Sequence, residues 1–205
     1  FNGQKLGIHL GGFTPFNFEV TKLLKQTDNF LIVKVDNKRI KEGVPTLNTD
    51  WWNYGGLTRE VKLVETSENF IQDYFIQLDP NDNRKIKGYV ILNGVNVAHQ
   101  NVQIHIPQLN IKKTLVTEKD GLVSFEIASN KIKYWTVEDP ILYKVSLQTE
   151  EDEITDQIGF RSISTKGAHI LLNQKPIFLK GISIHEESPI HKGRAYSEED
   201  AEQLL

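Results

Sequence analysis

Val123-Ser124-Phe125-Glu126-Ile127 alternates apolar and polar side chains at every position, which is the two-residue period of a β-strand. Between such runs, Asn93-Gly94 and Asp120-Gly121 are dipeptides that tolerate positive φ, and we expect them to close hairpins. The chain is therefore predicted to be mainly β and to form antiparallel sandwiches. Further β-branched or aromatic runs lie at 30–35 (FLIVKV), 61–64 (VKLV), 89–92 (YVIL) and 143–147 (YKVSL).

Helices are predicted only near the two ends of the chain. Apolar residues spaced i, i+3 and i+4 within 20–24 (VTKLL) favour one short helical turn. Ser197 is a good N-cap residue, and the acids at 198–200 suit the positive end of the helix dipole. We therefore expect a helix from this serine to the last residue.

Two polar interruptions divide the predicted strands. One lies at 65–69 (ETSEN), and the other is the acidic segment 150–153 (EEDE), which we interpret as a solvated turn. Beyond it we expect a hairpin at 173–176 (NQKP). The latter half of 177–184 (IFLKGISI) is apolar on both faces and precedes a loop and a helix. That order is typical of the first βα unit of a parallel barrel.

Composition argues against several functions. The chain has 24 Lys and Arg against 27 Asp and Glu, a net charge of −3, which is too little basic surface for nucleic-acid binding. Without cysteine it has no disulfide, thiolate zinc site or cysteine nucleophile, and both cytosol and periplasm are compatible with that. No apolar run approaches the roughly 20 residues of a membrane helix. We therefore expect neither a nucleic-acid nor a membrane partner.

The start of the chain resembles the interior of a protein. Residues 1–7 (FNGQKLG) are typical of the middle of a hairpin, with an Asn-Gly turn followed by an alternating strand. No basic-then-apolar leader precedes them. We therefore expect the chain to be a fragment.

Short segments from three successive parts of the chain resemble glycoside hydrolase family 2. Residues 11–16 (GGFTPF) and 50–61 (DWWNYGGLTREV) resemble its sugar-binding jelly roll, and 135–143 (WTVEDPILY) resembles its immunoglobulin-like middle domain. Residues 159–161 (GFR) and 179–186 (LKGISIHE) resemble the beginning of its catalytic barrel. The resemblance implies a mainly β chain with three parts: a partial jelly roll at 1–66, an immunoglobulin-like sandwich at 67–158 and the start of a (β/α)8 barrel at 159–205.

The family resemblance implies a retaining exo-β-glycosidase that hydrolyses terminal β-D-galactosides or β-D-glucuronides. Such an enzyme needs two carboxyl groups about 5 Å apart. The family's acid/base glutamate follows an asparagine, and this chain contains no Asn-Glu dipeptide, so we place both catalytic glutamates downstream and none in this segment. Alternative functions are a non-catalytic carbohydrate-binding β-sandwich protein and a purely structural spacer.

The choice of sugar is only partly visible in the sequence. The residues after His185, at 186–189 (EESP), match neither the glucuronidase nor the galactosidase continuation of the family. A basic segment at 192–194 (KGR) offers cations for a carboxylated sugar, although a solvated loop is the simpler interpretation. We therefore favour a galactoside slightly over a glucuronide.

The resemblance also implies which residues bind substrate. His185 ends the first predicted barrel strand, where barrel active sites are built, and Glu186 either orients its ring or is a solvated acid. Asp50 lies in a sandwich loop that the family directs toward the barrel mouth; an Asp bonding its own turn is the alternative. Trp52, with Trp51, offers a sugar-stacking platform, although we expect at least one of the pair to be core. Asn53 is a further candidate.

Cofactor and partner expectations follow from the same resemblance. Apart from His185, the histidines show no i, i+4 or HExxH spacing, so we predict no metal site in this segment. The resemblance implies no required cofactor and allows a sodium or magnesium ion in the full-length enzyme. It implies a carbohydrate substrate, and we expect a homo-oligomer for the full-length enzyme.

Overall fold

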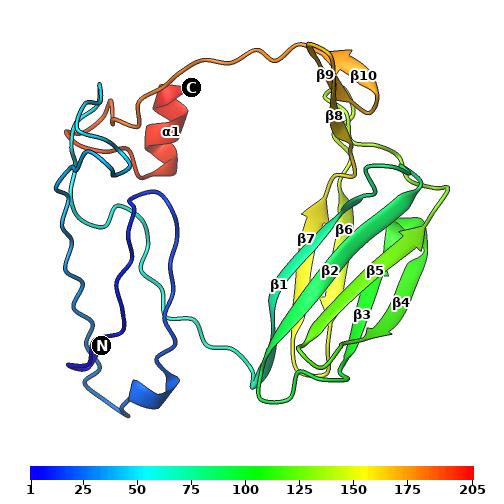
Figure 1. Ribbon diagram of the computed structural model, residues 1–205, viewed down its shortest axis with the longest axis horizontal. Helices are drawn as coiled ribbons and strands as arrows, with labels where there is room; N and C mark the ends of the chain where they lie inside the picture. Colours follow the sequence, from blue (N-terminus) through cyan, green and yellow to red (C-terminus); the bar gives the residue numbers. More distant parts are fainter. The chain divides into compact units, whose positions relative to one another are not determined.

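The computed structural model describes residues 1–205, which divide into two compact units. One unit combines Phe1–Lys62 with Gly181–Leu205, and the other is Leu63–Lys180. Figure 1 shows that the strands belong to the second unit. None of the helices is both long and apolar enough to span a membrane.

The Leu63–Lys180 unit contains a β-sandwich of two antiparallel sheets (Figure 1). One sheet has the strand order β1-β2-β5 and the other has the order β4-β3-β6-β7. The predicted mainly β fold with an antiparallel sandwich is thus confirmed. The strands are β1 (Asn69–Leu78), β2 (Lys85–Gly94), β3 (Asn101–Ile106), β4 (Ile111–Val116), β5 (Leu122–Ala128), β6 (Tyr143–Gln148) and β7 (Glu153–Ile158), with a 3₁₀ turn η2 (Pro107–Leu109) between β3 and β4.

The alternation in the sequence decides which side chains fill the space between the sheets. In β5, Val123, Phe125 and Ile127 are buried while Ser124 and Glu126 are exposed. The central strand β3 contributes three side chains with no exposed surface. Each such aliphatic side chain stabilises the fold by about 1.5–3 kcal/mol relative to an exposed one. One continuous core therefore joins the two sheets.

The two Gly dipeptides do not close hairpins, so that prediction was wrong. The chain passes from one sheet to the other between β2 and β3, and again between β4 and β5. Gly94 instead pairs with Asn69 at the end of the β1–β2 ladder, with φ +137°. A Cβ there would lie 1.9 Å from the carbonyl oxygen of Glu68. Dipeptides of this kind indicate a position with positive φ. Such a position occurs in hairpin turns, and it also occurs where a strand leaves its sheet.

The acidic segment 150–153 is more than a solvated turn. Glu151 accepts hydrogen bonds from the backbone N–H of Asn69 at 2.9 Å and from its side-chain amide at 2.8 Å. Asp152 accepts one from the N–H of Ile71 at 2.8 Å. Since β1 pairs with β2 along one edge only, these carboxylates satisfy N–H groups at its other edge.

A third sheet, smaller than the two of the sandwich, follows them within the same unit. It has the order β10-β9-β8, formed by β8 (Ile163–Lys166), β9 (His169–Leu172) and β10 (Lys175–Ile177). The predicted hairpin at 173–176 is confirmed, because β9 pairs antiparallel with β10. Asn173 and Gln174 have φ of 49° and 69°, the positive values that a type I′ turn requires.

The other unit contains only two regular elements, η1 (Thr21–Leu23) and α1 (Glu198–Leu204). Both helical predictions are confirmed, and Ser197 caps α1 as expected. The strands expected at 30–35 and in the latter half of 177–184 do not form, nor does the one at 61–64. A strand requires a ladder of hydrogen bonds to a neighbouring strand, and none of these segments pairs with one; Ile32 and Ile182 are 78% and 79% exposed. The expected barrel strand is therefore absent here.

Candidate functional site

Asp50 and His185, two of the predicted site residues, lie together in the unit that combines Phe1–Lys62 with Gly181–Leu205. The Oδ2 atom of Asp50 is 3.6 Å from the Nε2 atom of His185. That distance allows an ion pair when the imidazole is protonated, but it is too long for a hydrogen bond. The ring of Trp51 lies edge-on to the imidazole, with centroids 6.0 Å apart. Both polar side chains have exposed atoms, so they can meet a ligand.

Short-range hydrogen bonds shape the loop that carries Asp50. The carbonyl oxygen of Trp51 accepts from the guanidinium of Arg39 at 3.1 Å. Asn53 donates its side-chain amide to the carbonyl oxygen of Asn37 at 2.9 Å, and the amide of Asn37 donates back to the carbonyl of Asn53. One N–H of the Asn53 amide is therefore used within the protein, which leaves its other N–H and its side-chain oxygen for a ligand.

The two indoles of this loop are not core residues. Trp51 is 40% exposed and Trp52 is 73% exposed, so the expectation that at least one is buried was wrong for this structure. Trp52 forms part of the wall of an open hollow of about 700 Å³. An exposed indole beside polar groups is a surface on which the CH groups of a sugar pack well. The hollow is lined by Trp52, Asn53, Tyr54 and residues 187–193.

Glu186 is held by two arginines and does not touch the ring of His185. Its Oε2 atom accepts a hydrogen bond from Nε of Arg194 at 2.7 Å and lies 2.6 Å from Nη2 of the same side chain, and its Oε1 atom pairs with Arg59. Partial burial raises the pKa of Glu186, but the hydrogen bond and charge of Arg194 and the charge of Arg59 outweigh it. The pKa therefore lies below its usual value, and the carboxylate stays ionised with both oxygens occupied.

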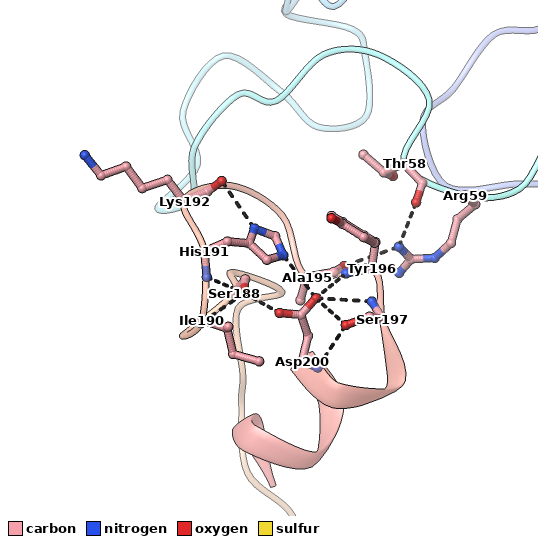
Figure 2. Close-up of polar contacts among 10 residues, drawn as sticks. All are labelled: Thr58, Arg59, Ser188, Ile190, His191, Lys192, Ala195, Tyr196, Ser197 and Asp200. Carbon is pink, nitrogen blue, oxygen red and sulfur yellow. Dashed lines mark hydrogen bonds and ion pairs between the residues drawn. The ribbon is translucent and has the colours of Figure 1, made fainter.

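The sequence analysis missed the most buried polar side chain of this unit, Asp200 (Figure 2). Its Oδ1 atom accepts from the hydroxyl of Ser188, and its Oδ2 atom accepts from the hydroxyl of Ser197 at 2.9 Å. Oδ2 also accepts from the N–H groups of Tyr196 and Ser197 at 3.1 and 3.2 Å. The Ser188 hydrogen bond, followed by these others, holds the pKa of Asp200 well below its usual value despite its burial.

A short motif would have revealed this carboxylate. The spacing S-x-x-D at 197–200 is that of a capping box, in which serine and acid each bond the backbone N–H of the other. The same carboxylate then reaches beyond its helix, because the Nε2 atom of His191 lies 3.3 Å from its Oδ2 atom. Asp200 thus links the start of α1 to the loop that follows His185.

Backbone hydrogen bonds close that loop on itself. The N–H of Ser188 donates to the carbonyl of Gly193 at 3.0 Å, and the N–H of Ala195 donates to the carbonyl of Glu186 at 3.0 Å. The loop therefore presents residues 187–193 to the hollow as one closed turn. Nowhere in residues 1–205 do three or more His, Asp or Glu side chains gather in a way that could hold a metal ion.

Comparison with known proteins connects this arrangement to a family. Residues 69–161, which contain the sandwich strands, match the model of the family described as Glycosyl hydrolases family 2. A β-galactosidase of Clostridium acetobutylicum is 29% identical over 210 residues, covering 97% of this chain and 23% of the relative. A β-galactosidase of Streptococcus thermophilus is 30% identical over 210 residues, covering 97% of this chain and 20% of the relative.

A solved structure agrees. The crystal structure of a GH2 β-galacturonidase from Eisenbergiella tayi bound to galacturonate matches with a TM-score of 0.62 and 26% identity, covering 82% of this chain and 31% of that one. The chain spans less than a quarter of the length of the two β-galactosidases. Residues 69–161 of this chain are thus similar to glycosyl hydrolase family 2, and nearly the whole chain is similar to segments of these β-galactosidases.

Proposed function

We propose that the chain is part of a retaining exo-β-glycosidase acting on terminal β-D-galactosides, and that Asp50, Trp52, Asn53 and His185 bind the terminal sugar. The observation that carries the proposal is the approach of Asp50 to His185, two residues far apart in sequence, beside an exposed indole. The β-galactosidase names of the relatives support the reaction and the sugar.

The side chains suit the recognition of a sugar. The carboxylate of Asp50 accepts hydrogen bonds from hydroxyl groups, and the imidazole of His185 donates or accepts one. The Trp52 face packs against ring CH groups, which adds apolar contact. These residues orient the sugar; bond cleavage is assigned to two glutamates outside this segment, as the mechanism of retaining glycosidases requires two carboxyl groups across the scissile bond.

The same proposal assigns a domain to each part of the chain. Residues 1–66 would be the later part of a sugar-binding jelly roll, 67–158 an immunoglobulin-like sandwich, and 159–205 the start of a (β/α)8 barrel. The three- and four-stranded sheets support the middle assignment. The apolar segments at 30–35 and 182–184 support the jelly-roll and barrel assignments, because their residues are typical of β-strands.

The proposed preference for galactosides over glucuronides rests on charge. The guanidinium of Arg194 is already paired with Glu186, so it is a poor partner for a sugar carboxylate. Lys192 lines the hollow and takes part in none of the ion pairs of the structure, which keeps β-D-glucuronides as the alternative. The galacturonate bound by the Eisenbergiella relative belongs to that uronide class. Relative rates on nitrophenyl β-galactoside and β-glucuronide separate the two.

A sodium or magnesium ion at Asp50 would need oxygen ligands besides the carboxylate of that residue. Both ions prefer several oxygen ligands, and Asp50 offers one exposed carboxylate without a second acid beside it. A cation there would also need carbonyl, amide or water oxygens as ligands, and the proposed binding role involves no metal.

The test is kinetic, in the longer protein that the proposal implies. A charge-assisted hydrogen bond to a buried polar group contributes about 1.5–3 kcal/mol, so Asp50→Ala or His185→Ala should lower kcat/KM roughly ten- to a hundred-fold. Glu19→Ala is the matched control, because Glu19 is an exposed acid of the same unit. Unchanged kinetics for both site variants would refute the proposal.

A second candidate, a non-catalytic carbohydrate-binding protein, is favoured by the exposed Trp52 in a segment without a catalytic pair. It predicts that the longer protein binds galactosides without hydrolysing them. Calorimetric binding without any release of nitrophenol would favour this candidate over the glycosidase.

A further inference from the structure

Arg59 lies where the two segments of the Phe1–Lys62 and Gly181–Leu205 unit meet. Its guanidinium donates to Oε1 of Glu186 and to the carbonyl oxygen of Ala195, the latter at 3.3 Å. A third bond goes to the carbonyl of Thr58 at 3.3 Å, and Figure 2 shows the side chain reaching toward Ala195. One arginine thus donates two hydrogen bonds from the segment of Asp50 to the segment of His185.

Glu186 extends this contact into a network. Its second oxygen, Oε2, lies 2.7 Å from Nε and 2.6 Å from Nη2 of Arg194. An isolated exposed ion pair contributes little, but a carboxylate shared between two guanidiniums belongs to a network of charges, which contributes more than a single pair. Arg194 is also the least exposed of the three side chains, at 28% against 59% for Arg59 and 42% for Glu186. The carboxylate is therefore anchored on both sides.

The contact between Asp50 and His185 cannot fix its own geometry. The two side chains approach only to 3.6 Å, and the carboxylate of Asp50 is 80% exposed. Glu186 directly follows His185, and Arg59 lies in the same 50–61 segment that Asp50 begins. A change in the contact between Arg59 and Glu186 is therefore expected to change the separation of Asp50 and His185.

We propose that Arg59 and Glu186 are positioning residues, which set the separation of Asp50 and His185 by fastening one segment to the other. Glu186 then serves the sugar site through its arginines and does not contact the sugar. The claim that this separation matters for substrate binding rests on the proposed function. The claim that Arg59 and Glu186 hold the two segments together does not depend on it. A rigid spacing favours recognition because small displacements of orienting groups are costly.

A structural test can be made on the 205-residue chain by NMR. The rings of Trp51 and His185, with centroids 6.0 Å apart, should give a nuclear Overhauser effect between their protons. Arg59→Gln should abolish it, whereas Lys62→Gln should preserve it. Lys62 is a matched control, because its ammonium forms an exposed ion pair with Glu60 on the same segment. An unchanged effect in Arg59→Gln would overturn the proposal.

Arg59→Lys and Glu186→Gln make the test specific. Lysine keeps the charge but lacks the planar fork, so it should not restore the full effect. Glu186→Gln removes the ionised acceptor and should reproduce the loss; it also serves if Arg59→Gln fails to fold. Full rescue by lysine would contradict positioning by geometry, since charge alone would then suffice.

A kinetic arm separates positioning from general destabilisation in the longer protein. Arg59→Gln should lower kcat/KM about tenfold, but the double variant with Asp50→Ala should be little worse than Asp50→Ala alone. Residues that act through one another are non-additive in this way. Multiplicative losses would refute the positioning role. If Asp50→Ala and His185→Ala leave kcat/KM unchanged, the proposed function is wrong. The NMR experiment still tests whether Arg59 and Glu186 hold the two segments together.

Discussion

Ile104→Ala should destabilise the sandwich strongly, because its side chain lies on the central strand β3 with no exposed surface. Its backbone neighbours in register are Lys113 on β4 and Leu147 on β6. The change deletes three carbons, worth about 0.8 kcal/mol each on transfer from water, or about 2.4 kcal/mol in all. The unfilled cavity raises the expected loss to about 3–4 kcal/mol.

The assay is urea unfolding followed by circular dichroism, with thermal unfolding as a second measurement. A loss of this size should lower the melting temperature by roughly 15–25 °C for a sandwich of this length. Lys113→Ala, an exposed change at the register partner, should alter the free energy of unfolding by less than about 0.5 kcal/mol. A loss below about 1 kcal/mol for Ile104→Ala would refute close packing between the two sheets.

Three further outcomes are expected. Gly94→Ala should cost about 1–3 kcal/mol of stability, since a side chain at φ +137° would collide with the carbonyl of Glu68; Gly167→Ala, at φ +59° with open space around it, should cost less when both are compared by urea titration. Because the folded pKa of Asp200 is depressed, its contribution to stability should be complete above its usual value of 3.8 and be lost as pH falls below it, and an acid titration of Asp200→Asn should lack that component. The 205-residue chain alone should release no nitrophenol from β-galactoside or β-glucuronide, and turnover that follows the purified protein would contradict the placement of both catalytic glutamates elsewhere.

Glu151 would be a poor kinetic control. By sequence, Glu151 belongs to an acidic segment that resembles a solvated turn, yet it accepts two hydrogen bonds from Asn69. Replacing it would disturb the start of β1, so Glu19 is the better choice. Charge density along the chain cannot reveal such a contact, because the donor lies in a different strand.

What the sequence determined by itself is local. Alternation placed Val123, Phe125 and Ile127 on the buried face of β5, and the N-cap Ser197 began the last helix, because both signals act within a few residues. The role of Asp200 in capping the helix could also have been predicted from the sequence, because a capping box is a short motif. The family motifs likewise indicated glycosyl hydrolase family 2 from short runs of residues.

Tertiary structure alone decided the rest. The approach of Asp50 to His185, the capture of Glu186 by Arg59 and the exposure of Trp52 all depend on segments distant in sequence. The strand-like run at 30–35 formed no strand, because a ladder needs a neighbour whose position no local propensity specifies. Local preferences bias a backbone over one or two turns, whereas contacts between distant side chains arise only once the whole unit has packed.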